Sequence, residues 1–273
     1  MAKLWTKNDE FLDDPVAEFC FARDVELDVS LLPYDVLGSL AHSRMLESIG
    51  ILTGPERQAI HSKLLELAAS FGAGAWRIEI SDEDVHTALE SRLGEAGSKL
   101  HTARSRNDQV LTDLRLLSKD RLLEVATEAV RLAGKLLASA KRNEFMPMPG
   151  YTHLQRAMPS SWGMWLGAFA EALADVLREL KLAHELMDQC PLGSGAGYGV
   201  SLPVDRELTA HLLGFSRVQR NSVYCQNSRG HFESVALSAL ASLMAVIGRL
   251  AADACLFCSQ EFAFLKLPGK YFT

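Results

Sequence analysis

The segment from residue 101 to residue 109 concentrates side chains that could bind an anionic substrate. It reads His-Thr-Ala-Arg-Ser-Arg-Asn-Asp-Gln, and it places Ser105, Arg106 and Asn107 directly before a long apolar helical pattern. Arginine side chains and the amides at a helix N-terminus are groups that bind carboxylates. The alternative is a capping segment, in which Asn107 or Asp108 only caps the helix. Spacing alone leaves both interpretations open.

Two further segments carry a histidine in polar surroundings. Residues 149–155 place Thr152 and His153 after a turn rich in proline and glycine. Because a histidine titrates near neutral pH, it can serve as a general acid or base, although a loop histidine that only makes hydrogen bonds is the alternative. Residues 81–90 begin with an acidic run that suits a helix N-terminus, with His86 one turn along. Here the alternative is a surface histidine.

Long helices are predicted to position these segments. Apolar stripes of helical period start at Leu111, at Pro159 and near Arg229. Each persists well beyond the average helix length of ~11–12 residues. Helices this long, and apolar on more than one side, are expected in a bundle whose members also pack against other subunits.

The first part of the chain has shorter and weaker helical patterns, such as 33–49 and 55–71. We therefore predict an all-α fold with a small N-terminal helical domain over residues 1–108. A central long-helix bundle follows over residues 109–273. Long alternating patterns typical of strands do not stand out.

Composition and charge narrow the function classes. The chain has 28 basic and 34 acidic residues, a net charge of -6, which argues against a nucleic-acid partner. Five cysteines without disulfide-scaffold spacing are typical of a reducing compartment. The longest uncharged stretch, 234–248, falls short of the ~20 residues that span a bilayer. We expect a cytoplasmic protein with no membrane role.

Together, the three polar segments resemble the motifs of the argininosuccinate lyase family, within the fumarase/aspartase superfamily, in family order and with family-like separations. Lens δ-crystallins are relatives that share the first motif. The resemblance extends from residues 3–5, through 34–44, to Glu261 and Phe262, and so covers essentially the whole chain. One departure is Ala103, which stands where a glycine is usual.

The resemblance implies a fold, a reaction and a set of site residues. The reaction splits argininosuccinate into arginine and fumarate by general acid/base catalysis, as a step of arginine biosynthesis, without cofactor or metal. In this family, the site is built from three subunits of a homotetramer. The implied residues are His153 for proton transfer, and Asn107, Thr152, Ser105, Arg106 and His86 for substrate binding or its support.

Members of the family continue into a mobile loop whose serine is taken to be the catalytic base, whereas this chain ends at Thr273. We therefore expect a fragment with an incomplete bundle, no C-terminal domain and no activity of its own. Two alternatives stay open. One is another fumarate-releasing lyase of the superfamily, of the adenylosuccinate lyase type. The other is a non-catalytic structural homologue or an inactive fragment.

Overall fold

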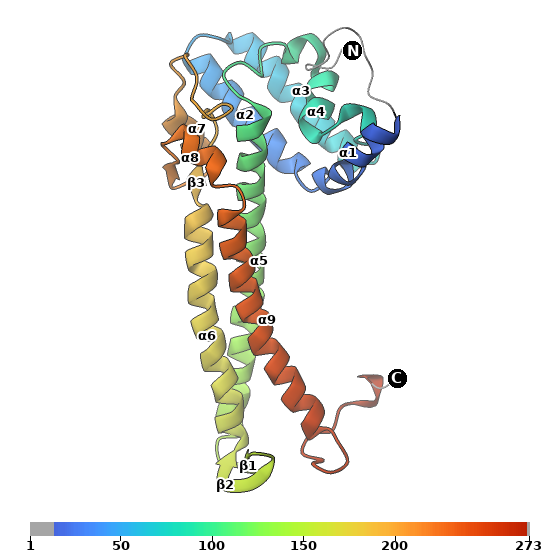
Figure 1. The fold of residues 1–273 in the computed structure, drawn as a ribbon, viewed down its shortest axis with the longest axis vertical. Coiled ribbons are helices and arrows are strands. Elements are labelled where there is room, and N and C mark those ends of the chain that lie inside the picture. The colour runs from blue at the N-terminus through green and yellow to red at the C-terminus, as the bar shows by residue number, and fades with distance from the viewer. Residues whose placement is uncertain (1–13, 272–273) are drawn as a thin grey trace. The chain divides into compact units, whose positions relative to one another are not determined.

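The computed structural model describes residues 14–271, which divide into two compact units (Figure 1). One unit contains the chain up to Leu117 together with Asp188–Arg229. The other contains Ser118–Met187 and the chain from Gly230 onward. Helices make up most of both units and confirm the predicted all-α class.

The first unit is a cluster of short helices around an apolar core. The predicted helices 33–49 and 55–71 are confirmed to within one residue at each end. Thr53 and Glu56 form a capping box that starts the second of them. The helices and strands of this unit are α1 (Asp14–Asp28), α2 (Leu32–Ser48), α3 (Gly54–Gly72), α4 (Val85–Leu93), the start of α5 (Arg106–Arg142), β3 (Gln189–Cys190), α7 (Arg206–Leu212), β4 (Arg217–Val218) and α8 (Ser222–Asn227), with short 3-10 turns at Ile80–Asp82 and Gly94–Gly97.

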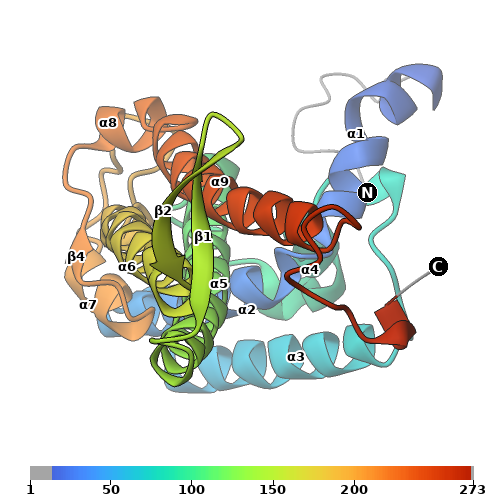
Figure 2. The same cartoon turned by 90° about the horizontal axis from the view of Figure 1, so that it is seen from below.

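The second unit contains the predicted long helices. The remainder of α5 packs with α6 (Trp162–Met187) and α9 (His231–Phe257), and a short 3-10 turn lies at Gly269–Tyr271. The side chains of the predicted stripes, such as Leu173 on α6 and Leu243 on α9, are buried in one cluster. A hairpin of β1 (Pro147–Thr152) and β2 (Gln155–Ser161) joins α5 to α6 at one end of these helices (Figure 2).

The predicted start of the second long helix at Pro159 is wrong, because residues 155–161 pair with β1 as a strand. The helix begins only at Trp162, after Ser161, whose Oγ accepts a hydrogen bond from the Met164 amide at 3.1 Å. A serine that caps the first turn in this way is a strong N-terminal signal. The prolines in both strands hid the hairpin, since proline is uncommon within sheets.

Residues 188–229 pack with the first unit, although they follow a helix of the second. Buried Arg115 on α5 helps to hold residues 188–229 against the first unit. Its Nη1 donates to the Gln189 carbonyl at 2.7 Å, and its Nη2 donates to Ser228 Oγ at 3.0 Å. Packing therefore divides the chain differently from the sequence-based domains 1–108 and 109–273, which stay a prediction.

By length and composition, α9 is the one helix of the described chain that could cross a membrane, with a mean hydropathy of 1.9 over its most apolar window. The apolar core helix of a soluble protein meets the same criterion, so this single helix is weak evidence for a membrane span.

Candidate functional site

The N-terminus of α5 carries a hydrogen-bonded group of polar side chains. The backbone N–H and Nδ2 of Asn107 both donate to Ser105 Oγ at 3.3 Å. Arg229 Nη2 donates to the backbone carbonyl of Asn107 at 3.0 Å and to its Oδ1 at 3.1 Å. Arg229 therefore adds a positive charge to a helix N-terminus that already favours anions. Sequence reasoning placed Arg229 only near a helix start.

Arg106 is turned toward the N-terminus of α4. Its Nη1 lies 3.2 Å from Glu83 Oε2 and 3.1 Å from Asp84 Oδ2, and its Nη2 donates to Thr87 Oγ1. Asp84 is also the cap of α4, because its Oδ1 accepts from the Thr87 amide at 2.8 Å. These bonds join the first and third polar segments of the sequence in one place.

A cleft of about 560 Å³ lies within the first unit, over these groups. Arg106, Asn107 and Arg229 line it together with His86. Carboxylates also line it, namely those of Asp24, Asp28 and Asp84. A cleft with arginines, an amide and carboxylates can bind a small ligand that bears charges of both signs.

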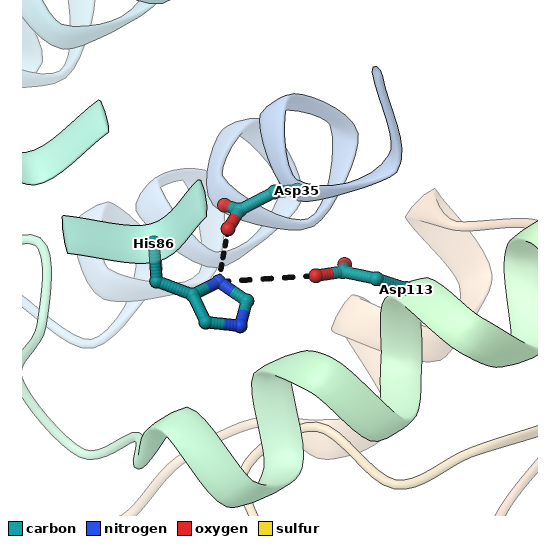
Figure 3. Close-up of side chains that lie close together, drawn as sticks. All are labelled: Asp35, His86 and Asp113. Atoms are coloured by element: carbon teal, nitrogen blue, oxygen red, sulfur yellow. Dashed lines mark hydrogen bonds and ion pairs between the residues drawn. The ribbon is translucent and has the colours of Figure 1, made fainter. Parts of the chain in front are cut away.

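His86 is buried beside two carboxylates that come from different helices (Figure 3). Its Nδ1 is hydrogen-bonded to Asp35 Oδ2 from α2, and it lies 3.8 Å from Asp113 Oδ2 on α5. Burial alone would lower the pKa of His86, but the negative charge of Asp35, their hydrogen bond and then Asp113 raise the pKa to about 9. The imidazole is therefore a cation at neutral pH. The alternative of a surface histidine is therefore wrong.

The two carboxyl groups beside His86 are not equivalent. Burial raises the pKa of Asp113 well above its ordinary value, and the charge of Asp35 adds to this effect. Burial also acts to raise the pKa of Asp35, but the His86 cation, the His86 hydrogen bond and Arg104 lower it on balance. The pKa values of the two carboxyl groups therefore move in opposite directions, and Asp35 is the one that is hydrogen-bonded to His86.

Asp35, His86 and Asp113 are also the one group of described side chains spaced to hold a metal ion, with ligand atoms within 4.8 Å of one another. A protonated imidazole cannot bind a metal, because both ring nitrogens carry a proton. The guanidinium of Arg104 already supplies positive charge to both carboxyl groups. The arrangement fits a buried ion pair better than a metal centre.

Helix α2 holds the segment 101–109 in place. Arg104 Nη1 donates to Ser39 Oγ at 3.0 Å, and Ser39 Oγ donates to Asp35 Oδ1 at 3.1 Å. One turn along α2, His42 Nε2 lies 2.8 Å from the Thr102 carbonyl. Burial, and next the charge of Arg104, lower the pKa of His42 to about 3, so that its ring is neutral and Nε2–H donates. Helix α2 is thus bonded to the segment at the Thr102 carbonyl and at the Arg104 side chain.

The carboxylate of Asp108 fixes the segment from its other side. Asp108 Oδ1 accepts from the Ser105 amide at 2.8 Å. Its Oδ2 accepts from the amides of Gly193 at 2.9 Å and Gly195 at 2.8 Å. Both glycines have positive φ, which lets the loop turn its amides toward one oxygen. Asp108 therefore does more than cap its helix, because it also binds the loop that contains Gly193 and Gly195.

Thr152 and His153 lie in the second unit, at the tip of the β1–β2 hairpin. Thr152 pairs with Gln155, so His153 and Leu154 form the two-residue turn, with φ of 51° and 60°. Positive φ at both positions is the geometry of a tight hairpin turn, and it is uncommon in residues other than glycine, asparagine, aspartate and histidine. Both predicted site residues are exposed.

The structure thus brings four of the six predicted site residues together within the first unit, and it places the other two in the second. Sequence reasoning missed Asp35, Asp113 and Arg104 as partners of His86. A signal was present at Asp113, which lies among the apolar residues Val110, Leu111, Leu114 and Leu117 of α5. A carboxyl group on an apolar helix face is rarely buried without a partner.

The profile of the lyase family matches residues 17–272 of the chain. An argininosuccinate lyase from Phocaeicola vulgatus is 46% identical over 99% of this chain and 61% of its own length. One from Thermotoga neapolitana is 44% identical over 99% of this chain and 69% of its own length. Among solved structures, an EDDS lyase variant with bound fumarate has a TM-score of 0.78 at 29% identity, over 87% of this chain and 47% of that chain.

The chain spans 61% of the length of the Phocaeicola relative. The match covers 99% of this chain. Together, the family profile and the Thermotoga relative establish that this chain belongs to the lyase family, and within it to the argininosuccinate lyases.

Proposed function

We propose that the protein cleaves argininosuccinate to arginine and fumarate, and that this chain supplies the part of the site that holds the substrate. The observation that carries the proposal is the cleft of the first unit. The cleft is lined by Asn107, Arg106, Arg229 and His86. The chain that forms it is 44–46% identical to argininosuccinate lyases.

The charges of the cleft match those of the proposed substrate. Argininosuccinate carries carboxylates on its succinyl half, and it carries a guanidinium and an ammonium group on its arginine half. The α5 N-terminus with Asn107 and Arg229 suits the carboxylates. Asp28 and Asp84, which line the same cleft, suit the cationic groups.

The elimination breaks the carbon–nitrogen bond after a proton leaves the neighbouring carbon. A base removes that proton, preorganised donors stabilise the charge that develops on the adjacent carboxylate, and an acid protonates the guanidino nitrogen. We assign proton transfer to His153, with Thr152 as a substrate-binding neighbour. Their exposed position at a hairpin tip supports a role toward a ligand or a second subunit.

We further propose that the protein assembles as a homotetramer. Three exposed apolar residues lie seven positions apart on the second-unit part of α5, namely Leu123, Val130 and Leu137, with 60%, 56% and 62% of their surface accessible. A seven-residue apolar spacing is typical of helices that pack against partner helices. A cytoplasmic location and a place in arginine biosynthesis accompany this proposal. We expect no cofactor.

Fumarate release tests the proposed reaction. The whole protein that carries these residues is supplied with argininosuccinate, and fumarate is followed by its ultraviolet absorbance. We expect fumarate and arginine in equal amounts, and Asn107→Ala should lose most of the activity. Ser62→Ala, on an exposed part of α3, serves as the control. Release of fumarate from adenylosuccinate in its place would identify the alternative lyase.

Light scattering tests the proposed assembly. Val130→Lys together with Leu137→Lys should lower the mass from four chains to one or two. The control Leu65→Lys changes an equally exposed leucine of α3, with 58% of its surface accessible, and should leave the mass unchanged. Retention of the tetramer by the double variant would exclude this face of α5 from the assembly.

A further inference from the structure

The carboxylate of Asp35 is bonded to His86 and is connected through Ser39 to the segment 101–109, but it does not line the cleft. Its Oδ2 is bonded to His86 Nδ1, and its Oδ1 accepts from Ser39 Oγ at 3.1 Å. Arg104 Nη1 in turn donates to Ser39 Oγ at 3.0 Å. A hydrogen-bonded chain therefore runs from the arginine-rich segment through Asp35 to the imidazole.

Every hydrogen bond and ion pair that His86 makes within the described chain uses Nδ1. His86 also lines the cleft that contains Arg106 and Asn107, whereas Asp35 and Asp113 do not. In Figure 3 the two carboxyl groups approach the Nδ1 side of the ring, and the second ring nitrogen lies on the opposite side. A carboxylate on one imidazole nitrogen fixes the orientation and protonation of the other.

We infer that Asp35 is a positioning residue for His86. Its carboxylate holds Nδ1, so that a proton-bearing Nε2 is presented to the cleft as a fixed donor to a substrate carboxylate. This inference rests on the proposed function for the identity of the ligand, but not for the geometry. His86 then contributes a permanent positive charge, and it does not exchange its proton during the reaction.

The surroundings of His86 are mostly acidic, and they are consistent with a fixed cation. Asp35 on α2 and Asp113 on α5 face the ring directly, and Asp84, the N-cap of α4, lies two residues before His86. Asp28 of α1 and Glu90 of α4 also interact with its charge. The basic groups nearby are His101, whose pKa burial and the arginines lower to about 4, and Arg104, which is bonded to the Asp35 side. Arg106, which lines the same cleft, is paired with Glu83 and Asp84.

Nitrogen NMR of the histidine rings tests the inference without an activity assay. The protein is labelled with ¹⁵N-histidine, and the His86 signals are assigned by their loss in His86→Gln. In the wild type, both ring nitrogens should keep imidazolium shifts from pH 6 to pH 8. In Asp35→Asn, the ring should become neutral within that range. Asp113→Asn is the matched control, because it removes the carboxyl group that lies 3.8 Å from Nδ1 and keeps the one that is hydrogen-bonded to Nδ1, and this variant should retain the imidazolium.

Two results would overturn the inference. One is a neutral His86 ring at pH 7 in the wild type, and the other is an imidazolium that persists in Asp35→Asn. If Asp35→Asn does not fold by circular dichroism, Asp35→Glu replaces it, and displacement of the His86 shifts is then the expected result. A shift of the His86 signals on addition of Zn²⁺ or Co²⁺ would identify a metal ligand and would also overturn it.

Kinetics separate this inference from the proposed function. In the whole protein, Asp35→Asn should raise KM for argininosuccinate at least tenfold and change kcat less, since the donor acts on binding. If fumarate release is absent in the wild type while the His86 signals behave as expected, the proposed function fails and the positioning role stands. If release is normal and the His86 signals ignore Asp35, only the inference fails.

Discussion

The two histidines assigned to the site occupy opposite environments. His86 lies in the first unit, buried and bonded through Nδ1 to a carboxylate. His153 lies in the second unit, exposed in a two-residue turn with left-handed backbone. A buried imidazole that is paired with a carboxylate is held in one orientation, whereas an exposed one is accessible to a ligand or a second subunit. The difference fits the proposed roles, in which the first unit binds the substrate and the second unit carries the residue for proton transfer.

The largest expected effect is on proton transfer. In the whole protein, His153→Asn should lower turnover by about 10²–10⁴, because general acid/base groups contribute that much to rate. The fold should be unchanged, since the side chain is exposed. His211→Asn, an exposed histidine of α7, is the control. Near-normal turnover in purified His153→Asn protein would break the comparison.

Removal of the Asp108 carboxylate should cost the first unit much of its stability. Asp108→Ala deletes three hydrogen bonds from the amides of Ser105, Gly193 and Gly195. We expect a loss of about 3 kcal/mol in the free energy of unfolding, since bonds to charged groups contribute most. Urea denaturation measures it, with Glu124→Gln on the exposed face of α5 as the control. Equal midpoints for the two variants would contradict the role given to Asp108.

The pH dependence of stability should show the His86 ion pair. Because the folded pKa of about 9 lies above the ordinary value of 6.5, the contribution is fully present below pH 6.5 and is lost as the pH rises through 9. The size is roughly 3 kcal/mol by the usual conversion. His86→Gln should flatten this alkaline decline in a series of urea melts. A decline of equal steepness in the variant would mean that another group causes it.

On the acidic side, His42 should act in the opposite direction. Its folded pKa of about 3 lies below the ordinary 6.5, so unfolding takes up a proton as the pH falls below 6.5. Stability should therefore decline from pH 6.5 toward pH 3, and His42→Gln should reduce that decline. An unchanged acid profile in the variant would show that carboxyl groups alone cause the acid sensitivity.

The smallest effect concerns one backbone position in the motif. Ala103 has φ of 64°, a conformation that glycine adopts without strain. Ala103→Gly should stabilise the fold by up to about 1 kcal/mol, because relief of strain exceeds the added entropy of the unfolded chain. Thermal melts would detect it against Ala126→Gly, a position within α5 where glycine should destabilise. Destabilisation by both variants would contradict this account.

Much of the fold was open to prediction from the sequence. The stripes of α6 and α9 predicted buried faces, since residues such as Leu180 and Val246 repeat at helical spacing and do lie in the core. The β1–β2 hairpin was not predicted. Its prolines and its His153–Leu154 turn lack the residues that usually mark such a structure. Local pattern therefore predicted the helices but not the element that carries His153.

The site was only partly predictable, because its partners are distant in the chain. The polar groups of residues 101–109 are evident from the sequence. Asp35, however, is 51 residues from His86, and no local sequence pattern relates the two. Gly193 and Gly195 likewise bond to Asp108 from 85 and 87 residues away. Resemblance to a family supplied roles for the motif residues. It did not supply the buried carboxyl groups that hold them.

The most direct test of this division is calorimetric titration of the protein with argininosuccinate. The account predicts that Asn107→Ala weakens binding by about ten- to a hundredfold, the worth of a hydrogen bond to a charged group. It also predicts that His153→Asn, which loses turnover, binds argininosuccinate with a dissociation constant within a few-fold of the wild-type KM. If His153→Asn abolished binding and Asn107→Ala bound normally, the assignment of binding to the first unit would be wrong.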